Sequence, residues 1–271
     1  MKKLFLFALF AALCCSCTES GTDENTDPNG GSNSGQTTPP DPDPDPDPDP
    51  DAKDVIHVPE GGMLAGILNE LGLKSPSSLK LSGTLGVSDF TTLRNIQSLE
   101  HLDISRVNLS VLPTEAFLEC TNIKSVILPN TLTAIGTQAF WGSSLVSISI
   151  PASVETIEDQ AFEGCSLLAT VTFEKGSQLK TVDGFSNCTA LTTVDMSACT
   201  QVTRIEYRAF YEDSKLQLFK IGTRTPPSCG DDVFSRYINS SSVLKVPAGC
   251  VDAYKKAYDW NQFTTISELD E

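Results

Sequence analysis

Cysteine is the residue type in this chain that could do redox or metal chemistry and that recurs at a regular spacing. Cys120, Cys165 and Cys188 each lie three residues after a phenylalanine of a repeated phrase, and Ser143 and Asp213 hold the same place in two further copies. A small polarizable residue at one recurring position fits a tight interior turn, so we predict a buried column of these side chains. No CxxC or Cys/His spacing indicates a zinc site.

Two pairs of cysteines could form disulfides in an oxidising compartment. Cys165 and Cys188 lie on adjacent copies of the phrase, but side chains stacked in register rarely have disulfide torsions. Cys229 and Cys250 flank the last expected strand and are the better candidate pair. The sequence leaves the redox state of this pair open.

Histidine and the acidic residues give no pattern typical of catalysis. The two histidines are His57, before the repeats, and His101, at an outward strand position. No GxSxG, HExxH, P-loop or GxGxxG motif occurs, and acid pairs such as Asp231-Asp232 are typical of solvated turns. We therefore predict a protein that is not an enzyme and that needs no metal or cofactor.

Six copies of one phrase fill the middle of the chain, at spacings of 23, 22, 23, 25 and 24 residues. We number the copies one to six by a phenylalanine near the end of each: Phe117, Phe140, Phe162, Phe185, Phe210 and Phe234. Each copy opens with a strand-like segment that is apolar at positions one, four and six, such as LVSISI at 145–150. A second apolar pair follows in the first five copies, and copy four has lost two residues between that pair and its phenylalanine.

The spacing of the copies predicts how they fold. A unit of ~23 residues can form one coil but cannot bury its apolar side alone, so neighbouring coils stack and share a core. We therefore predict a mainly β solenoid of about six coils whose strands pair edge to edge. Residues 59–73 and 249–258 have the pattern of short helices that would cap the two ends.

The repeated phrase L-x-x-I-x-I-P-x-x-V-x-x-I-x-x-x-A-F-x-x-C resembles the BspA-like leucine-rich repeats of surface lipoproteins from Bacteroides and related bacteria. Residues 244–260, LKVPAGCVDAYKKAYDW, look like the C-terminal closure of that family, and residues 79–105 look like its N-terminal approach to the repeats. The resemblance implies a right-handed leucine-rich-repeat coil, exposed at the cell surface, with a binding or adhesion role. It fixes no ligand, because function depends on the variable positions of such a fold.

Two sets of side chains should face outward from the coils. Positions three and five of the strand-like segments form a flat, hydroxyl-rich stripe that includes Ser125, Ser147, Ser149, Thr170, Thr172 and Thr193. The residue after each repeat phenylalanine varies freely and is Leu118, Trp141, Glu163, Ser186 or Tyr211 in the first five copies. The aromatic residues of this second set could anchor a protein or a sugar, or could fold onto the neighbouring coil.

Three functions fit these surfaces. The leading hypothesis is a non-enzymatic adhesin that binds a protein of the host matrix or of a bacterial surface through the strand stripe. The second is a glycan-binding accessory lipoprotein that uses exposed aromatics such as Trp141. Protein binding leads because sugar sites usually combine an aromatic platform with amides, acids or Arg, which the stripe lacks. The third is a structural coat protein without a specific ligand.

The N-terminus has the features of an export signal. Lys2 and Lys3 precede ten apolar residues and the sequence CCSC, and the apolar run is too short to span a membrane. Ser16-Cys17 resembles the lipobox of bacterial lipoproteins, which implies a lipid on Cys17 and anchoring at the outer membrane. Cys15 is the alternative acceptor, and an ordinary cleaved signal is the other interpretation.

Composition and charge complete the expected organisation. The predicted parts are a signal peptide at 1–16, a lipidated Asp-Pro-rich spacer at 17–54, an N-terminal cap at 55–98, repeats at 99–242 and a C-terminal cap at 243–271. The signal contributes +2 and the spacer, with eleven acids and one Lys, contributes −10, so −8 of the formal charge of −16 remains on the folded part. That charge makes nucleic acid and anionic lipid poor partners, and leaves the lipid anchor as the contact with a membrane.

Overall fold

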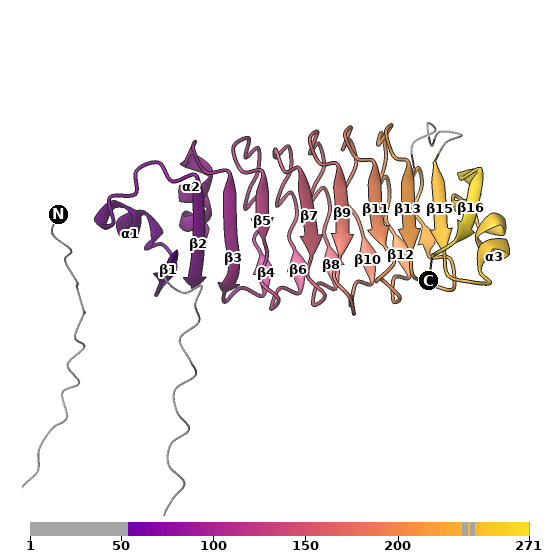
Figure 1. The fold of residues 1–271 in the computed structure, drawn as a ribbon, viewed down its shortest axis with the longest axis horizontal. Coiled ribbons are helices and arrows are strands. Elements are labelled where there is room, and N and C mark those ends of the chain that lie inside the picture. Colours follow the sequence, from indigo (N-terminus) through magenta and orange to yellow (C-terminus); the bar gives the residue numbers. More distant parts are fainter. Residues whose placement is uncertain (1–53, 235–237, 239–241, 271) are drawn as a thin grey trace, which may run out of the picture. The chain divides into compact units, whose positions relative to one another are not determined.

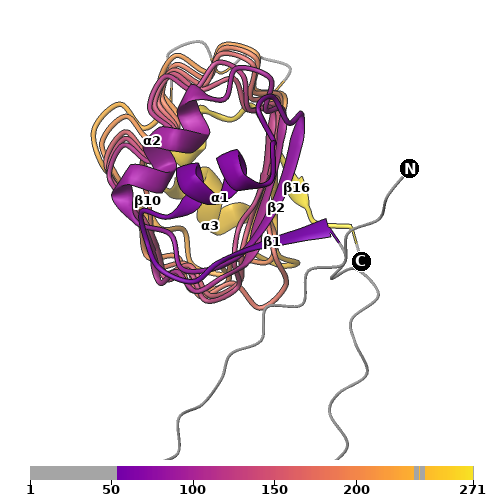
Figure 2. The ribbon, with the colours of Figure 1, turned by 90° about the vertical axis from the view of Figure 1, so that its left-hand side faces the viewer.

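A computed structural model describes residues 54–234, 238 and 242–270, which belong to one compact unit. Its strands are all paired in parallel and stand side by side along a rod (Figure 1). Viewed along the rod, successive coils lie over one another (Figure 2). The predicted mainly β solenoid is therefore confirmed. No helix within the described residues is long and apolar enough to cross a membrane.

One side of the rod is a broad array of strands in two adjoining sheets. The first sheet has the order β1 (Val55–Val58), β2 (Ser78–Gly83), β3 (His101–Val107), β5 (Ser125–Ile127). The second sheet comprises β7 (Ser147–Ile150), β9 (Thr170–Phe173), β11 (Thr193–Met196), β13 (Leu218–Ile221), β15 (Val243–Val246) and β16 (Thr265–Glu268). The two sheets adjoin between β5 and β7, where the amide of Val146 donates to the carbonyl of Lys124 at 3.1 Å.

The second apolar pair of the first five copies leads into a much narrower sheet, which β14 continues in the sixth. Its two-residue strands are β4 (Val111–Leu112), β6 (Ala134–Ile135), β8 (Thr156–Ile157), β10 (Thr181–Val182), β12 (Arg204–Ile205) and β14 (Ser228–Cys229). In each of the first five of these strands the second residue is buried and the first is exposed or half-buried. The buried residue faces the core that both sheets enclose, which is why the repeat keeps an apolar residue there.

The six repeat phenylalanines form a continuous column of buried rings. From Phe117 to Phe210 the ring centroids of neighbouring coils are 5.1, 5.0, 4.7 and 5.4 Å apart, with interplanar angles of 14° or less. Phe90 closes one end of the column edge-on, and Phe219 meets Phe210 and Phe234 edge-on at the other. Because each ring contacts the coil before and the coil after it, the column couples the repeats along the rod.

The turn that presents each phenylalanine has an unusual backbone. In most coils the residue two before the ring and the residue two after it have positive φ, as at Gln138 (φ 54°) and Gly142 (φ 63°) around Phe140. The left-handed region disfavours side chains, so the glycines at the later position relieve strain. This turn stacks on its neighbours through backbone bonds such as Phe140 N–H to the carbonyl of Ala161, at 2.7 Å.

Both ends of the core are closed by helices, as predicted, but their bounds differ from the prediction. At the N-terminal end α1 (Leu64–Glu70) is shorter than the expected 59–73, and a second helix, α2 (Val87–Asn95), lies in a segment that we had assigned to the approach to the repeats. The buried carboxylate of Asp89 holds the two helices together, because it accepts hydrogen bonds from the amides of Gly62, Leu64 and Gly86 at 2.6–3.0 Å.

The C-terminal cap contains α3 (Val251–Lys256) and the short 3-10 helix η2 (Trp260–Gln262). The fully buried Trp260 donates from its indole nitrogen to the carbonyl of Pro227 at 2.9 Å and packs edge-on against Phe219. The aromatic side chains of the cap therefore cover the last coil and shield the end of the core from water.

Candidate functional site

The predicted stripe of outward residues exists, and we call it the strand face. It consists of the side chains at positions three and five of β3 to β13, and the register of the ladder aligns them in two rows. Ser147, Thr170 and Thr193 follow one another in the first row. Ser149, Thr172 and Asp195 follow one another in the second. Ser125, Ser147 and Ser149 and the threonines among them are exposed or half-buried, so their hydroxyl groups are available to a partner.

Charge is confined to the two ends of the strand face. At one end Asp103 accepts a hydrogen bond from the amide of Ser105 at 2.9 Å, and the neighbouring His101 Nδ1 lies 2.8 Å from Ser125 Oγ. At the other end Asp195 and Lys220 form an ion pair of 2.8 Å. Burial opposes ionisation of Asp195, but the bonds from Lys220 and Ser197 outweigh it and lower the pKa of this carboxyl. The paired Asp195 and Lys220 therefore present little net charge to a partner.

Ile127 is the large apolar side chain that is most exposed on the strand face. Ile127, at the end of β5, is 57% exposed, and its neighbour in the register is Asp103. An exposed isoleucine among hydroxyl groups contributes nothing to the core, and burial against a partner would remove its apolar surface from water.

The aromatic residues that follow the repeat phenylalanines are only partly accessible. Leu118, Trp141 and Tyr211 are each half-buried, because the turn that carries them is covered on both sides by the adjacent coils. Trp141 also contributes its carbonyl to the stacking, as acceptor for the amide of Glu119 at 2.7 Å. The Tyr211 ring is covered on one face by the guanidinium of Arg208, 4.7 Å from the ring centroid. Neither aromatic is a freely projecting anchor.

The predicted column of small buried residues is confirmed in Cys120, Ser143, Cys165, Cys188 and Asp213. The thiol of Cys165 donates to the carbonyl of Phe140 at 3.0 Å, and that of Cys188 donates to the carbonyl of Phe162 at 3.2 Å. Burial raises the pKa of Cys188 well above its ordinary value, so this thiol stays protonated. The column therefore has a packing role, which suits an inert cysteine.

The disulfide that the sequence allowed between Cys229 and Cys250 is not formed in the structure, where both are free thiols. Each sulfur is turned toward a carbonyl two residues earlier in its own segment, Pro227 for Cys229 and Ala248 for Cys250. Burial, with the nearby Asp259, raises the pKa of Cys229 to about 12. Cys165 and Cys188 are free as well.

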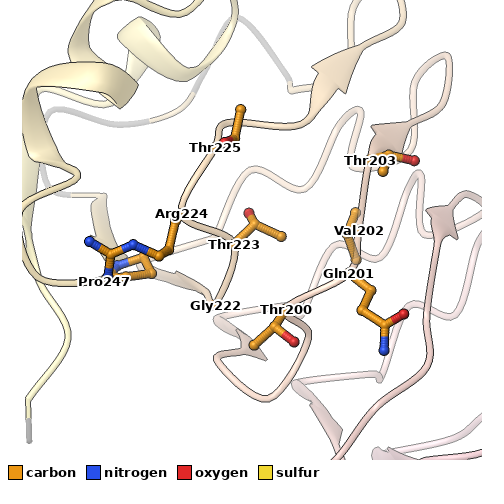
Figure 3. Close-up of a pocket in the computed structure, with 9 residues that line it drawn as sticks. All are labelled: Thr200, Gln201, Val202, Thr203, Gly222, Thr223, Arg224, Thr225 and Pro247. Carbon is orange, nitrogen blue, oxygen red and sulfur yellow. The ribbon is translucent and has the colours of Figure 1, made fainter.

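A large hollow lies on the side of coils five and six away from the phenylalanine turns, and no motif in the sequence indicated it. Its volume is about 670 Å³. It lies between the segment 200–203 and the segment 222–225, with Pro247 beside them (Figure 3). The polar groups there are largely committed: Thr223 Oγ1 lies 2.7 Å from the hydroxyl of Tyr254, and Arg224 donates to the carbonyl of Ala248 at 3.4 Å. The hollow therefore offers few free groups that could orient a ligand.

A smaller hollow of about 220 Å³ lies at the phenylalanine turns of coils three to five, and we call it the coil-four slot. Its lining is Asp159, Gln160, Glu163, Asp183, Gly184, Ser186, Asn187, Tyr207, Arg208 and Tyr211. Of the predicted outward residues that follow the repeat phenylalanines, Glu163, Ser186 and Tyr211 lie in it. The signal in the sequence was the two-residue deletion in copy four, which marks where the stack is interrupted.

Two further points concern metal binding and the lipid anchor. Within the part of the chain that the structure describes, no group of three or more His, Cys, Asp or Glu side chains is placed to hold a metal ion. Cys17, the predicted lipidation site, lies outside the described residues.

Comparison with known proteins assigns the fold to a family. The family model described as "BspA type Leucine rich repeat region (6 copies)" matches residues 85–217 and 134–264, more than half of the chain. A search of curated proteins found no match. One similar solved structure is a leucine-rich repeat protein from Bacteroides ovatus, which is 18% identical, has a TM-score of 0.46, and is matched over 79% of this chain and 69% of the other. Another is a leucine rich cell surface protein from Faecalibacterium prausnitzii, which is 16% identical, has a TM-score of 0.30, and is matched over 72% of this chain and 73% of the other. The family model matches the same repeats whose strands and phenylalanine column are described above. The chain therefore belongs to the BspA-type leucine-rich repeat family.

Proposed function

We propose that this protein is a non-enzymatic binding module of the cell surface, and that its strand face contacts a partner protein of the host matrix or of another bacterial surface. The observation that supports the proposal is the strand face itself, whose two registered rows carry uncharged hydroxyl side chains in the middle, with the exposed Ile127 in the second row. Flat surfaces with a buried apolar centre and a polar surround are typical of protein interfaces.

The strand face is large enough for this role. With β2, β15 and β16, which continue the array beyond the strand face, there are nine strands; at ~4.8 Å spacing they give a length of roughly 40 Å, and four residues per strand give a width of about 13 Å. The resulting area of about 500 Å² approaches the ~800 Å² per partner of a stable complex, and contacts at the flanking turns would supply the rest.

Ile127 is the residue on which the proposal is most directly tested. Full burial of an isoleucine is worth about 1.5–3 kcal/mol, so covering the exposed part of this side chain would contribute about 1–2 kcal/mol. That contribution corresponds to roughly 5–30-fold in Kd. An aspartate at this position would also place an unpaired charge in the interface, which adds to the loss.

The experiment measures binding of the purified protein to immobilised host matrix proteins and to intact bacterial cells. For a partner found in this way, Ile127→Asp is expected to weaken binding at least tenfold. The control is Val111→Asp, which changes a 44% exposed residue on the narrow sheet and should leave binding unchanged. Equal loss in both variants, or no loss in Ile127→Asp, would show that the strand face is not the binding surface.

We further propose that a lipid on Cys17 anchors the protein at the outer membrane and that the spacer at 17–54 displays the repeats outward. Cys17→Ala is expected to move the protein from the membrane fraction to the soluble fraction, and Cys15→Ala is the matched control. External protease applied to intact cells should remove the repeats if they face outward. Protection of the repeats would indicate a periplasmic orientation instead.

A further inference from the structure

The coil-four slot exists because one coil is shorter than its neighbours. Four residues separate the second apolar pair from the repeat phenylalanine in coils three and five, and two residues, Asp183 and Gly184, do so in coil four. Gly184 has φ +82°, and a Cβ added to it would lie 2.4 Å from the amide nitrogen of Ala161, so the short turn is held tightly against coil three. The flanking turns of coils three and five therefore stand two strand spacings apart, ~10 Å, with a hollow between them.

The shortened turn also interrupts the backbone ladder beside the slot. The amides of Glu115, Gln138 and Arg208, each two residues before a repeat phenylalanine, donate to the next coil at 3.0–3.1 Å. The amide of Gln160 holds the same position in coil three, and it has no such partner among the described residues. Within the described part of the chain, the backbone N–H of Gln160 is therefore a free donor at the wall of the slot, where a ligand or water can accept its hydrogen bond.

The walls of the slot differ in chemistry. Coil three contributes Asp159, Gln160 and Glu163, and coil five contributes two tyrosines. Arg208 lies between those rings, 4.8 Å from the centroid of Tyr207 and 4.7 Å from that of Tyr211. Tyr207 is 54% exposed, so much of its ring is available to a ligand.

The carboxylates of the slot have no basic partner. In the described structure neither Asp159, Glu163 nor Asp183 forms an ion pair, and Arg208 pairs instead with Asp232 at 3.7 Å. Asp183 accepts a bond from the amide of Gly184 at 2.6 Å. Burial raises the pKa of Asp183 to about 6, and the charges of Asp159, Glu206 and Glu163 add to this effect.

This combination of groups selects one class of ligand. Three carboxylates would repel a sulfated, sialylated or uronic sugar, and a cationic side chain, which they would attract, could not use the Gln160 backbone amide or the guanidinium of Arg208. A neutral polyhydroxylated ring can use all of the groups, since its hydroxyls donate to carboxylates and accept from amides and guanidinium while its apolar face packs on tyrosine. The volume of about 220 Å³ is below the range of pockets for drug-sized ligands and suits one sugar ring.

We propose that the coil-four slot binds a single neutral sugar residue, such as the terminal hexose or N-acetylhexosamine of a glycan. Asp159 and Glu163 accept hydrogen bonds from the hydroxyls of the sugar. The Asn187 side chain and the backbone amide of Gln160 donate hydrogen bonds to these hydroxyls, and the sugar ring packs against Tyr207. The site lies on the phenylalanine turns and shares no residue with the strand face, so it is independent of the protein partner proposed above.

The test measures binding of methyl glycosides of glucose, galactose, mannose and N-acetylglucosamine to the purified protein by saturation-transfer NMR and calorimetry. Saturable binding is expected for at least one of them. Tyr207→Ala should weaken it roughly tenfold through the lost ring contact, and Ser186→Trp should abolish it by filling the slot. Trp141→Ala, which changes an aromatic outside the slot, and Ile127→Asp, which changes the strand face, should both leave sugar binding intact.

Several results would overturn the proposal. They are absence of binding to all four glycosides at millimolar concentration, binding that survives Ser186→Trp in a variant with an unchanged melting temperature, and tighter binding of a lysine-rich peptide at the same residues. Because Ile127→Asp tests the strand face separately, failure of the sugar site and failure of the protein interface give different results.

Discussion

Replacing Asp213 by asparagine is expected to stabilise the solenoid at neutral pH and to leave its stability unchanged in acid. Asp213 is 4% exposed and occupies the cysteine column of coil five. Its Oδ1 accepts the amide of Cys188 at 2.8 Å, while its Oδ2 is buried without a hydrogen-bond partner. Burial raises the pKa of this carboxyl well above its ordinary value, and the charge of Glu212 adds to the shift.

The magnitude follows from proton linkage. Above the unfolded pKa of 3.8 the unfolded chain has lost the proton of Asp213, while the folded chain still holds it. The contribution of this group to stability is therefore fully present below pH 3.8 and is lost as the pH rises toward the folded pKa. Each pH unit in that interval lowers the free energy of unfolding by about 1.4 kcal/mol. Asparagine keeps an oxygen for the Cys188 amide but does not titrate, so the variant should escape this loss.

The assay is urea unfolding from pH 4 to pH 8, followed by circular dichroism and by the fluorescence of Trp141 and Trp260, which lie on either side of coil five. The difference in free energy between Asp213→Asn and the unmodified protein should be near zero at pH 4. It should then grow by about 1.4 kcal/mol per unit before levelling off. Asp213→Ala, which leaves the Cys188 amide without its acceptor, should instead cost about 1–3 kcal/mol relative to asparagine. A difference that stays flat from pH 4 to pH 8 would refute the reasoning.

Three further predictions concern the turns and the column. Gly184→Ala should cost more than ~2 kcal/mol, because its Cβ would collide with the Ala161 amide, whereas Gly176→Ala, with φ +84° and open space, should cost about 1 kcal/mol; similar losses in urea unfolding would argue against the close approach. Phe162→Ala removes a ring stacked at 5.0 and 4.7 Å and should cost about 3–5 kcal/mol, and a loss under 1 kcal/mol would show that the coils are not coupled through the column. Glu119→Gly should raise the melting temperature by relieving a residue at φ 49°, worth up to ~1 kcal/mol, and a lower melting temperature would contradict this.

The repeated features of the fold could be predicted because six copies report the same physical demand. The phenylalanine spacing indicated the stack of coils, the strand pattern indicated which side chains face outward, and the recurring cysteine position indicated a buried column. The narrow sheet was not predicted, because a two-residue strand such as Ala134–Ile135 has no periodicity of its own and forms only when neighbouring coils align it.

Features that occur once were harder to predict. The helix α2 (Val87–Asn95) contains two threonines and a serine, which favour other conformations. It is fixed by the contact of Phe90 with Phe117 of the first coil and by the hydrogen bonds that its Asp89 accepts from the N-terminal cap. The coil-four slot depends on residues from three coils, which come together only after stacking. Tyr211 was recognised as an unassigned aromatic, but its partners Arg208 and Tyr207 could be found only from their contacts in the structure.

The irregularity of coil four accounts for both the slot and the buried carboxyl group of Asp213 next to it. In coils one to three the amide at the cysteine position donates to the carbonyl of the repeat phenylalanine, as Cys165 does to Phe162 at 3.2 Å. In coil four the amide of Cys188 donates to Asp213 of the next coil instead. The buried carboxyl group of Asp213 thus accepts the hydrogen bond of the one turn that departs from the repeat. Replacing Asp183-Gly184 by the four residues that coil three has in this place should restore the regular turn, close the slot and remove the need for the Asp213 oxygen. Asp213→Ser would then be tolerated in the lengthened protein but destabilising in the natural one, and if it costs the same in both, the acid and the short turn are unrelated.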